Sequence, residues 1–185
     1  MTCAVRCCAV ILATLMLAGV AAAHVTPPVL LVSDRDALAG QLAGAQRFFV
    51  REVRLTPGER QAIQKQTGWS PDEDFYRFYI GRDAQGRTVA ATIFLTEYTV
   101  HGPVRVAVSL GPDATVKGAM VVELTEETYP WVKPLLDPQA RYLTANLGKS
   151  GLDAMGQFYG QIIGSLIKRA SLLYDVGVIK RGDAA

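Results

Sequence analysis

Two residue types that carry much of protein chemistry are scarce in this chain. It holds three cysteines and two histidines among 185 residues. The cysteines, Cys3, Cys7 and Cys8, all lie within the first eight residues. If that segment is removed, disulfides, zinc–thiolate sites, iron–sulfur clusters, c-type haem attachment and cysteine nucleophiles are all excluded. His24 and His101 have no companion at metal-ligand spacing, so we expect no metal site.

Other common functional signatures are also missing. The formal net charge is only +2, which gives no electrostatic reason to expect a nucleic-acid partner. No glycine-rich phosphate loop follows a strand, and Ser109 has no nucleophile-elbow motif around it. Glu123, Glu126 and Glu127 form an acidic cluster near an expected strand end. We interpret it as a solvated loop, with acid–base chemistry as the alternative.

The N-terminus has the pattern of an export signal. Arg6 precedes an almost wholly apolar run at residues 9–22, and Ala21 to Ala23 meet the small-residue rule for cleavage. We therefore expect a signal peptide at residues 1–23, a single domain at residues 24–185, and a periplasmic or otherwise exported protein. The alternative is an uncleaved membrane anchor, although the apolar run of roughly 15 residues is short for a span of about 20.

Capping signals predict two helices early in the exported part. Ser33 followed by Asp36 is typical of a helix start. Thr56, Pro57 and Glu59 give a cap, a proline at the first position and an acid at the third, and Gly68 is placed to end that helix. A short strand is expected between them, at residues 48–54.

From residue 75 the pattern changes to alternation with a period of two. Tight turns separate four runs rich in strand formers, at residues 75–80, 88–100, 104–110 and 116–124. Such an arrangement predicts an α+β fold, with an antiparallel meander sheet of about four to six strands packed against helices on one face.

Two more helices are expected toward the C-terminus. Asp137 and Pro138 predict a short helix ending at Gly148, and residues 150–153 predict the cap of a last helix that runs to about Asp175. In that last helix, glycines 156, 160 and 164 form one stripe, although each costs up to about 1 kcal/mol relative to alanine. The stripe indicates either tight packing or the close approach of a flat ligand.

Aromatic and basic residues gather just before the last helix. They are Tyr129, Trp131, Lys133, Arg141, Tyr142 and Lys149. A flavin ring needs an aromatic or apolar wall, and its phosphate needs basic side chains or a helix N-terminus, such as the one expected after Lys149 and Ser150. A protein-contact loop would have the same composition, so both interpretations stay open.

The order of these features resembles the periplasmic FMN-binding domain proteins, which are related to the flavin subunits of Rnf and sodium-pumping quinone reductase complexes. The resemblance covers roughly residues 48–175. It rests on the Leu-Thr-Pro helix start at residues 55–57, the Asp-Ala-Thr-Val-Lys-Gly turn at 113–118, the Glu-Thr-Tyr loop at 127–129, and Arg-Tyr-Leu-Thr-Ala-Asn-Leu-Gly-Lys at 141–149.

The resemblance implies an electron-transfer domain that binds FMN and works with a redox partner protein, expected to be membrane-associated. It places the ring against Tyr129, Phe158 or Tyr159 and the phosphate at Lys149. The residues implied in cofactor binding are Glu127, Tyr129, Lys149, Ser150, Gly156, Gln157, Phe158, Tyr159 and Gly160.

The chain departs from this family at the start of the last helix. The family's Asp-x-x-Ser-Gly-Ala-Thr motif attaches FMN through its threonine, whereas this chain has Tyr159 at that place, preceded by Phe158. Covalent attachment is therefore not expected. The two rings either fill the flavin site or stack on a loosely bound flavin. This gives two hypotheses: an electron carrier with non-covalent FMN, and a flavin-free binding or assembly module for a redox complex.

Overall fold

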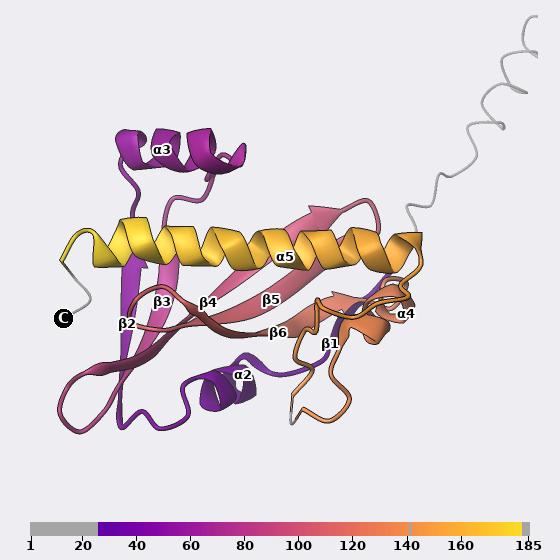
Figure 1. Cartoon of the computed structure of the whole chain (residues 1–185), viewed down its shortest axis with the longest axis horizontal. Coiled ribbons are helices and arrows are strands. Elements are labelled where there is room, and N and C mark those ends of the chain that lie inside the picture. The colour runs from indigo at the N-terminus through magenta and orange to yellow at the C-terminus, as the bar shows by residue number, and fades with distance from the viewer. Residues whose placement is uncertain (1–25, 141, 183–185) are drawn as a thin grey trace, which may run out of the picture.

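A computed structural model describes residues 26–140 and 142–182 (Figure 1). The predicted signal peptide, His24 and Arg141 lie outside this part of the chain. Within it, no helix is both long enough and apolar enough to cross a membrane.

The described residues form one antiparallel sheet of six strands in the order β1-β6-β5-β4-β3-β2. Strands β2 to β6 follow one another in chain order, so most of the sheet is a meander, and the predicted α+β class is confirmed. The strands are β1 (Pro28–Leu30), β2 (Arg47–Val53), β3 (Tyr76–Arg82), β4 (Thr88–Thr99), β5 (Gly102–Leu110) and β6 (Val116–Thr125). The helices are α2 (Asp34–Gln41), α3 (Pro57–Thr67), α4 (Tyr129–Val132), the 3-10 turn η1 (Lys133–Leu135), α5 (Ala154–Tyr174) and the π-helical turn η2 (Asp175–Ile179).

The alternation of side chains along β5 shows how the core is divided. Val104, Val106 and Val108 are fully buried in the main core, which α5 covers with its apolar stripe. Ala107 points to the other face and packs with Ala37 of α2 in a smaller cluster. The expected helix-covered face is therefore present under α5, and α2 adds a shorter layer on the opposite face (Figure 1).

The predicted helix starts form as their sequences dictate. The Ser33 hydroxyl accepts the backbone N–H of Asp36 (3.1 Å). At α3, Thr56 and Glu59 form a reciprocal capping box, in which each side chain accepts the other residue's backbone N–H (3.3 and 2.7 Å). Gly68 then ends α3 in the left-handed conformation, with φ +72°.

The short helix predicted between Asp137 and Gly148 is wrong. Residues 143–145 run extended beside β6 instead: Val121 N–H donates to Leu143 O (3.1 Å), and Ala145 N–H donates to Ala119 O (3.0 Å). The reason lies in the sheet, because β1 pairs only with residues 123–125 of β6. The remaining edge of β6 needs partners for its backbone groups, and this segment provides them.

Candidate functional site

The start of α5 differs from the expectation in one chemical respect. Asp153 is the N-cap, and its carboxylate accepts the backbone N–H of Gly156 (2.7 Å). An anionic group of the chain itself therefore occupies the helix N-terminus where we expected a phosphate. Lys149 and Ser150 lie exposed in the loop before this cap. Both side chains are accessible to an anion from solvent.

Tyr159 fills the space at the position where the resemblance places the flavin attachment. Its side chain is fully buried, and its ring stacks on Trp131 of α4, with centroids 5.8 Å apart and planes inclined by 15°. Phe158 lies edge-on against Tyr159 (5.3 Å) and is 44% exposed. One of the two aromatic residues therefore belongs to the core and the other faces solvent.

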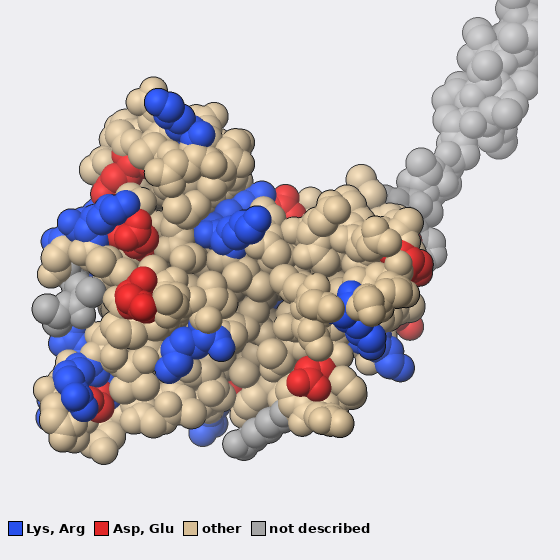
Figure 2. Space-filling view, in the orientation of Figure 1, with Lys and Arg blue, Asp and Glu red and all other residues tan. Residues whose placement is uncertain are grey.

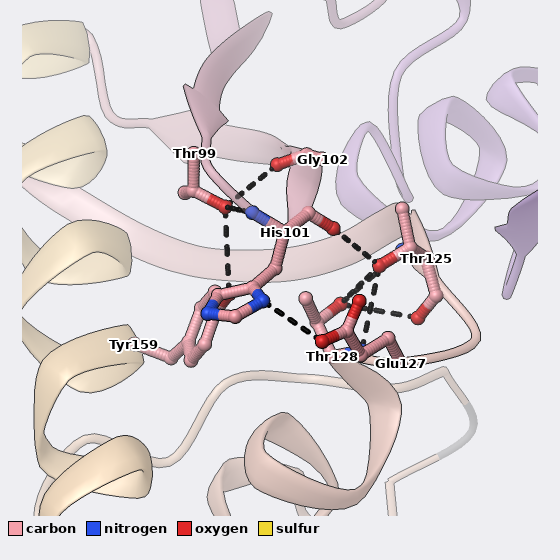
Figure 3. Close-up of polar contacts among 7 residues, drawn as sticks. All are labelled: Thr99, His101, Gly102, Thr125, Glu127, Thr128 and Tyr159. Atoms are coloured by element: carbon pink, nitrogen blue, oxygen red, sulfur yellow. Dashed lines mark hydrogen bonds and ion pairs between the residues drawn. The ribbon is translucent and has the colours of Figure 1, made fainter. Parts of the chain in front are cut away.

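A network of hydroxyl groups holds Tyr159 in place (Figure 3). Its phenol oxygen lies 3.4 Å from Thr99 Oγ1, at the end of β4. Thr99 in turn donates to Gly102 O (2.9 Å) and accepts from His101 N–H (3.1 Å), which fixes the β4–β5 turn. Thr125, at the end of β6, donates to His101 O (2.8 Å). These hydroxyls therefore support the turn and are engaged with backbone groups, not presented to a ligand.

His101 and Glu127 lie in contact beyond the end of β4. His101 Nδ1 lies 2.9 Å from Glu127 Oε1, and the imidazole packs edge-on against Trp131 (5.0 Å). Both side chains are partly exposed. Neither residue lines the groove described below. Among the described residues, no group of three or more His, Cys, Asp or Glu side chains could hold a metal ion.

Several of the predicted binding residues make ordinary structural contacts. Tyr129 opens α4, and Lys133 Nζ lies 5.9 Å from its ring centroid. Gln157 is exposed and donates through Nε2 to Leu152 O (3.0 Å). The structure thus brings Glu127, Phe158 and Tyr159 into one neighbourhood. The residues that connect them are Trp131, Thr99 and His101, which are not among the predicted cofactor-binding residues.

The glycine stripe of α5 packs against leucine side chains from the preceding segment. A Cβ at Gly160 would lie 3.7 Å from Leu135 Cδ2, and one at Gly164 would lie 3.6 Å from Leu147 Cδ1. A Cβ at Gly156 would be tighter, at 3.2 Å from Asp153 Oδ1. A methyl group would therefore fit at ordinary contact distance at Gly160 and Gly164, and only Gly156 is closely packed. The neighbours are Leu135 of η1 and Leu147 of the loop before α5.

A groove of about 370 Å³ opens beside the middle of α5, away from the predicted residues. Its lining includes the aromatic side chains of Trp69 and Tyr76 and the guanidinium of Arg169 from α5. The guanidinium of Arg169 stacks over Trp69 (4.9 Å) and pairs with Glu97 of β4. Burial raises the pKa of Tyr76 to about 12, so its phenol stays protonated at neutral pH. This volume is in the range that protein pockets offer to small ligands and peptide segments.

Burial also raises the pKa of Tyr159, partly offset by its contact with Thr99. The phenol is therefore a neutral group that cannot serve as a base near pH 7. On the face shown in Figure 2, basic and acidic side chains are interspersed and neither sign forms a continuous patch.

Comparison with known proteins gives no match: no protein family, no curated protein and no solved structure matches this chain. The resemblance to FMN-binding domains therefore stays a prediction that rests on the quoted motifs.

Proposed function

We propose that this protein is an exported, flavin-free binding or assembly module for a redox complex. The observation that carries this proposal is the buried Tyr159 ring, stacked on Trp131 at the position where the related motif would attach FMN. An isoalloxazine ring needs a slot at least as wide as an aromatic side chain, and here an aromatic side chain of the protein takes that place. Binding a flavin inside would require Tyr159 to leave the core.

The electrostatics at this position favour the same conclusion. The N-terminus of α5 is already capped by the Asp153 carboxylate. A phosphate placed there would meet a like charge, and the backbone N–H of Gly156 is already engaged by that carboxylate. Without flavin the chain holds no redox group that we can identify among its described residues, so it would act by binding a redox partner protein.

The second candidate, an electron carrier with non-covalent FMN, is favoured by two observations. Phe158 is 44% exposed beside Tyr159, and Lys149 and Ser150 lie exposed in the loop before α5. A flavin could stack on the outer face of Phe158, with its phosphate near Lys149. Such a cofactor would be held loosely and would exchange with solvent.

The visible absorption spectrum of the protein purified from an exporting host separates the two candidates. We expect a colourless protein that does not bind FMN at about 100 μM, a concentration at which even micromolar sites are filled. Tyr159→Thr combined with Phe158→Ala should open the site and confer FMN binding, whereas Tyr98→Ala, at an exposed aromatic elsewhere, should not. FMN binding by the unaltered protein that Phe158→Ala abolishes would overturn the proposal in favour of the electron carrier.

A further inference from the structure

Strand β4 is longer than the neighbour that should cover its outer edge. Its pairing with β3 runs from Ile93, opposite Phe78, to Thr88, opposite Arg82. Residues 95–99 pair only with β5. Within the described residues, no strand covers the other edge of this stretch, so its outward N–H and C=O groups are available to a new strand.

The groove beside α5 lies along this uncovered edge. Leu95, Thr96, Glu97 and Tyr98 all line it. Successive side chains of a strand point to opposite faces of the sheet. A cavity that touches four consecutive residues must therefore lie at the strand's edge, and an occupant of this groove would lie against the backbone of β4.

The wall opposite β4 is held in position before any partner binds. Arg60 of α3 donates through its guanidinium to Pro71 O and to Glu73 O, the latter at 2.6 Å. These bonds fix the segment that follows α3. Trp69, in the same segment, packs edge-on against Tyr76 (6.2 Å between centroids). A groove with fixed walls loses less conformational entropy when a ligand enters.

The charged residues that line the groove indicate which kind of ligand would fit. Each arginine lining the groove already has a carboxylate partner: Arg77 with Glu52, Arg105 with Asp34, and Arg169 with Glu97. Asp72 and Glu73 also line the groove, and both are exposed. Among the described residues, no ion pair engages either carboxylate. Asp72 and Glu73 are therefore the lining carboxylates that lack an ion-pair partner in this part of the chain, and they favour a basic side chain in the occupant.

The same sheet shows what happens where such an edge is covered. The part of β6 that β1 leaves open is paired by residues 143–145 of the chain itself. The open part of β4 has no equivalent segment within residues 26–140 and 142–182. The open edge of β6 is thus paired by another segment of the chain, whereas the open edge of β4 has a groove beside it.

We propose that this groove binds an extended segment of a partner protein, which adds as a strand to residues 95–99 of β4 and directs a lysine or arginine toward Asp72 and Glu73. The open stretch of five residues accommodates about 17 Å of extended chain. Backbone hydrogen bonds provide the affinity, and the aromatic wall and the two acids provide the specificity. The inference rests on the proposed role as a binding module and names how the partner is held.

Nuclear magnetic resonance tests this inference with defined probes. ¹⁵N-labelled protein is titrated with a pool of capped six-residue peptides in which Val, Leu or Phe alternates with Thr and one Lys. We expect amide shifts at residues 95–98 and a shift of the Trp69 indole N–H. A matched pool with Glu in place of Lys should bind more weakly. Asp72→Asn combined with Glu73→Gln should lower the affinity for the Lys pool by about threefold to tenfold, as for exposed charge pairs.

Two controls distinguish strand addition from nonspecific contact. N-methylation of alternate peptide bonds in the best peptide should abolish binding in one register and leave the other intact, since only one set of N–H groups faces β4. Val50→Lys marks the other open edge, β2, where Phe48 and Val50 are 64% and 60% exposed; it should leave binding unchanged. Shifts confined to β2, equal binding of the Glu pool, or no shifts at about 1 mM peptide, the limit of weak docking, would each overturn the inference. None of these readouts depends on FMN.

Discussion

Two aromatic clusters lie beside α5, one at its start and one at its middle, and they differ in how completely they are packed. At the start, Tyr159 is fully buried and stacked on Trp131. At the middle, Trp69 and Tyr76 border an open groove of about 370 Å³. The motif resemblance predicts a binding site at the first cluster, whereas the open groove lies at the second. A motif locates a position along the chain, but the volume that the side chains leave decides what can bind there.

The largest expected effect is on stability, and it contrasts the two clusters directly. Tyr159→Ala removes a fully buried ring and should lower the free energy of unfolding by about 3–5 kcal/mol. Trp69→Ala removes a ring that borders open space, so less packing is lost and the cost should be about 1–2 kcal/mol. Urea denaturation of both variants, followed by circular dichroism, measures the difference.

Phe158→Ala is the matched control for the first cluster, since its ring is adjacent to Tyr159 but 44% exposed. Its cost should be close to that of Trp69→Ala. Equal losses for Tyr159→Ala and Trp69→Ala would show that the two clusters are packed alike, and the contrast would fail.

A smaller effect on stability is expected from pH, and it arises at α3, next to the groove. Glu59 belongs to α3, whose Arg60 holds the groove wall. Its hydrogen bonds with Arg181 lower the pKa of the Glu59 carboxyl from 4.5 to about 2. Because the pKa of Glu59 is lower in the folded state, its ion pair with Arg181 adds to the free energy of unfolding. This contribution is complete above about pH 5 and is lost as the pH falls toward 2. Both partners are partly exposed, so we expect only about 1 kcal/mol at pH 7.

Glu59→Gln isolates this contribution. The variant should be less stable than the unaltered protein at pH 7, and the two should converge as the pH falls toward 2, measured by urea midpoints at each pH. Glu52→Gln is a control, because Glu52 forms a more exposed pair with Arg77 and should change stability less. A difference between Glu59→Gln and the unaltered protein that stays constant with pH would exclude the ion pair as its cause.

Much of the fold could be predicted from local sequence. The caps at Ser33 and Thr56 and the alternation from residue 75 onward specify their elements through short-range rules that tertiary contacts did not override. The segment after Asp137 could not be predicted this way. Its extended path is set by the unpaired edge of β6, a partner distant in sequence.

The candidate site was harder to predict for the same reason. Phe158 and Tyr159 are adjacent in sequence and equally aromatic, but Tyr159 is the buried one because it lies on the same face of α5 as Ile163 and Leu166. Its stacking partner Trp131 comes from another element, and that contact could not be read from the sequence. The groove depends on β4 extending beyond its pairing with β3. That mismatch appears only when the register is known, because strand ends cannot be fixed from composition.

The smallest effect concerns the glycine stripe that runs between the two clusters. Gly160→Ala adds a methyl group at ordinary contact distance from Leu135, 3.7 Å, and should stabilise the protein by about 0.5–1 kcal/mol through helix propensity. Gly156→Ala is the matched case, because its Cβ would lie only 3.2 Å from the capping Asp153 carboxylate. Its gain in stability should be smaller than that of Gly160→Ala, or should become a loss. Thermal unfolding of the two variants compares them, and a clear loss of stability in Gly160→Ala would mean that this part of the stripe is packed too tightly for a methyl group. A protein that keeps its peptide binding with alanine at residue 160 would show that this part of the stripe takes no part in the binding proposed at the open edge of β4.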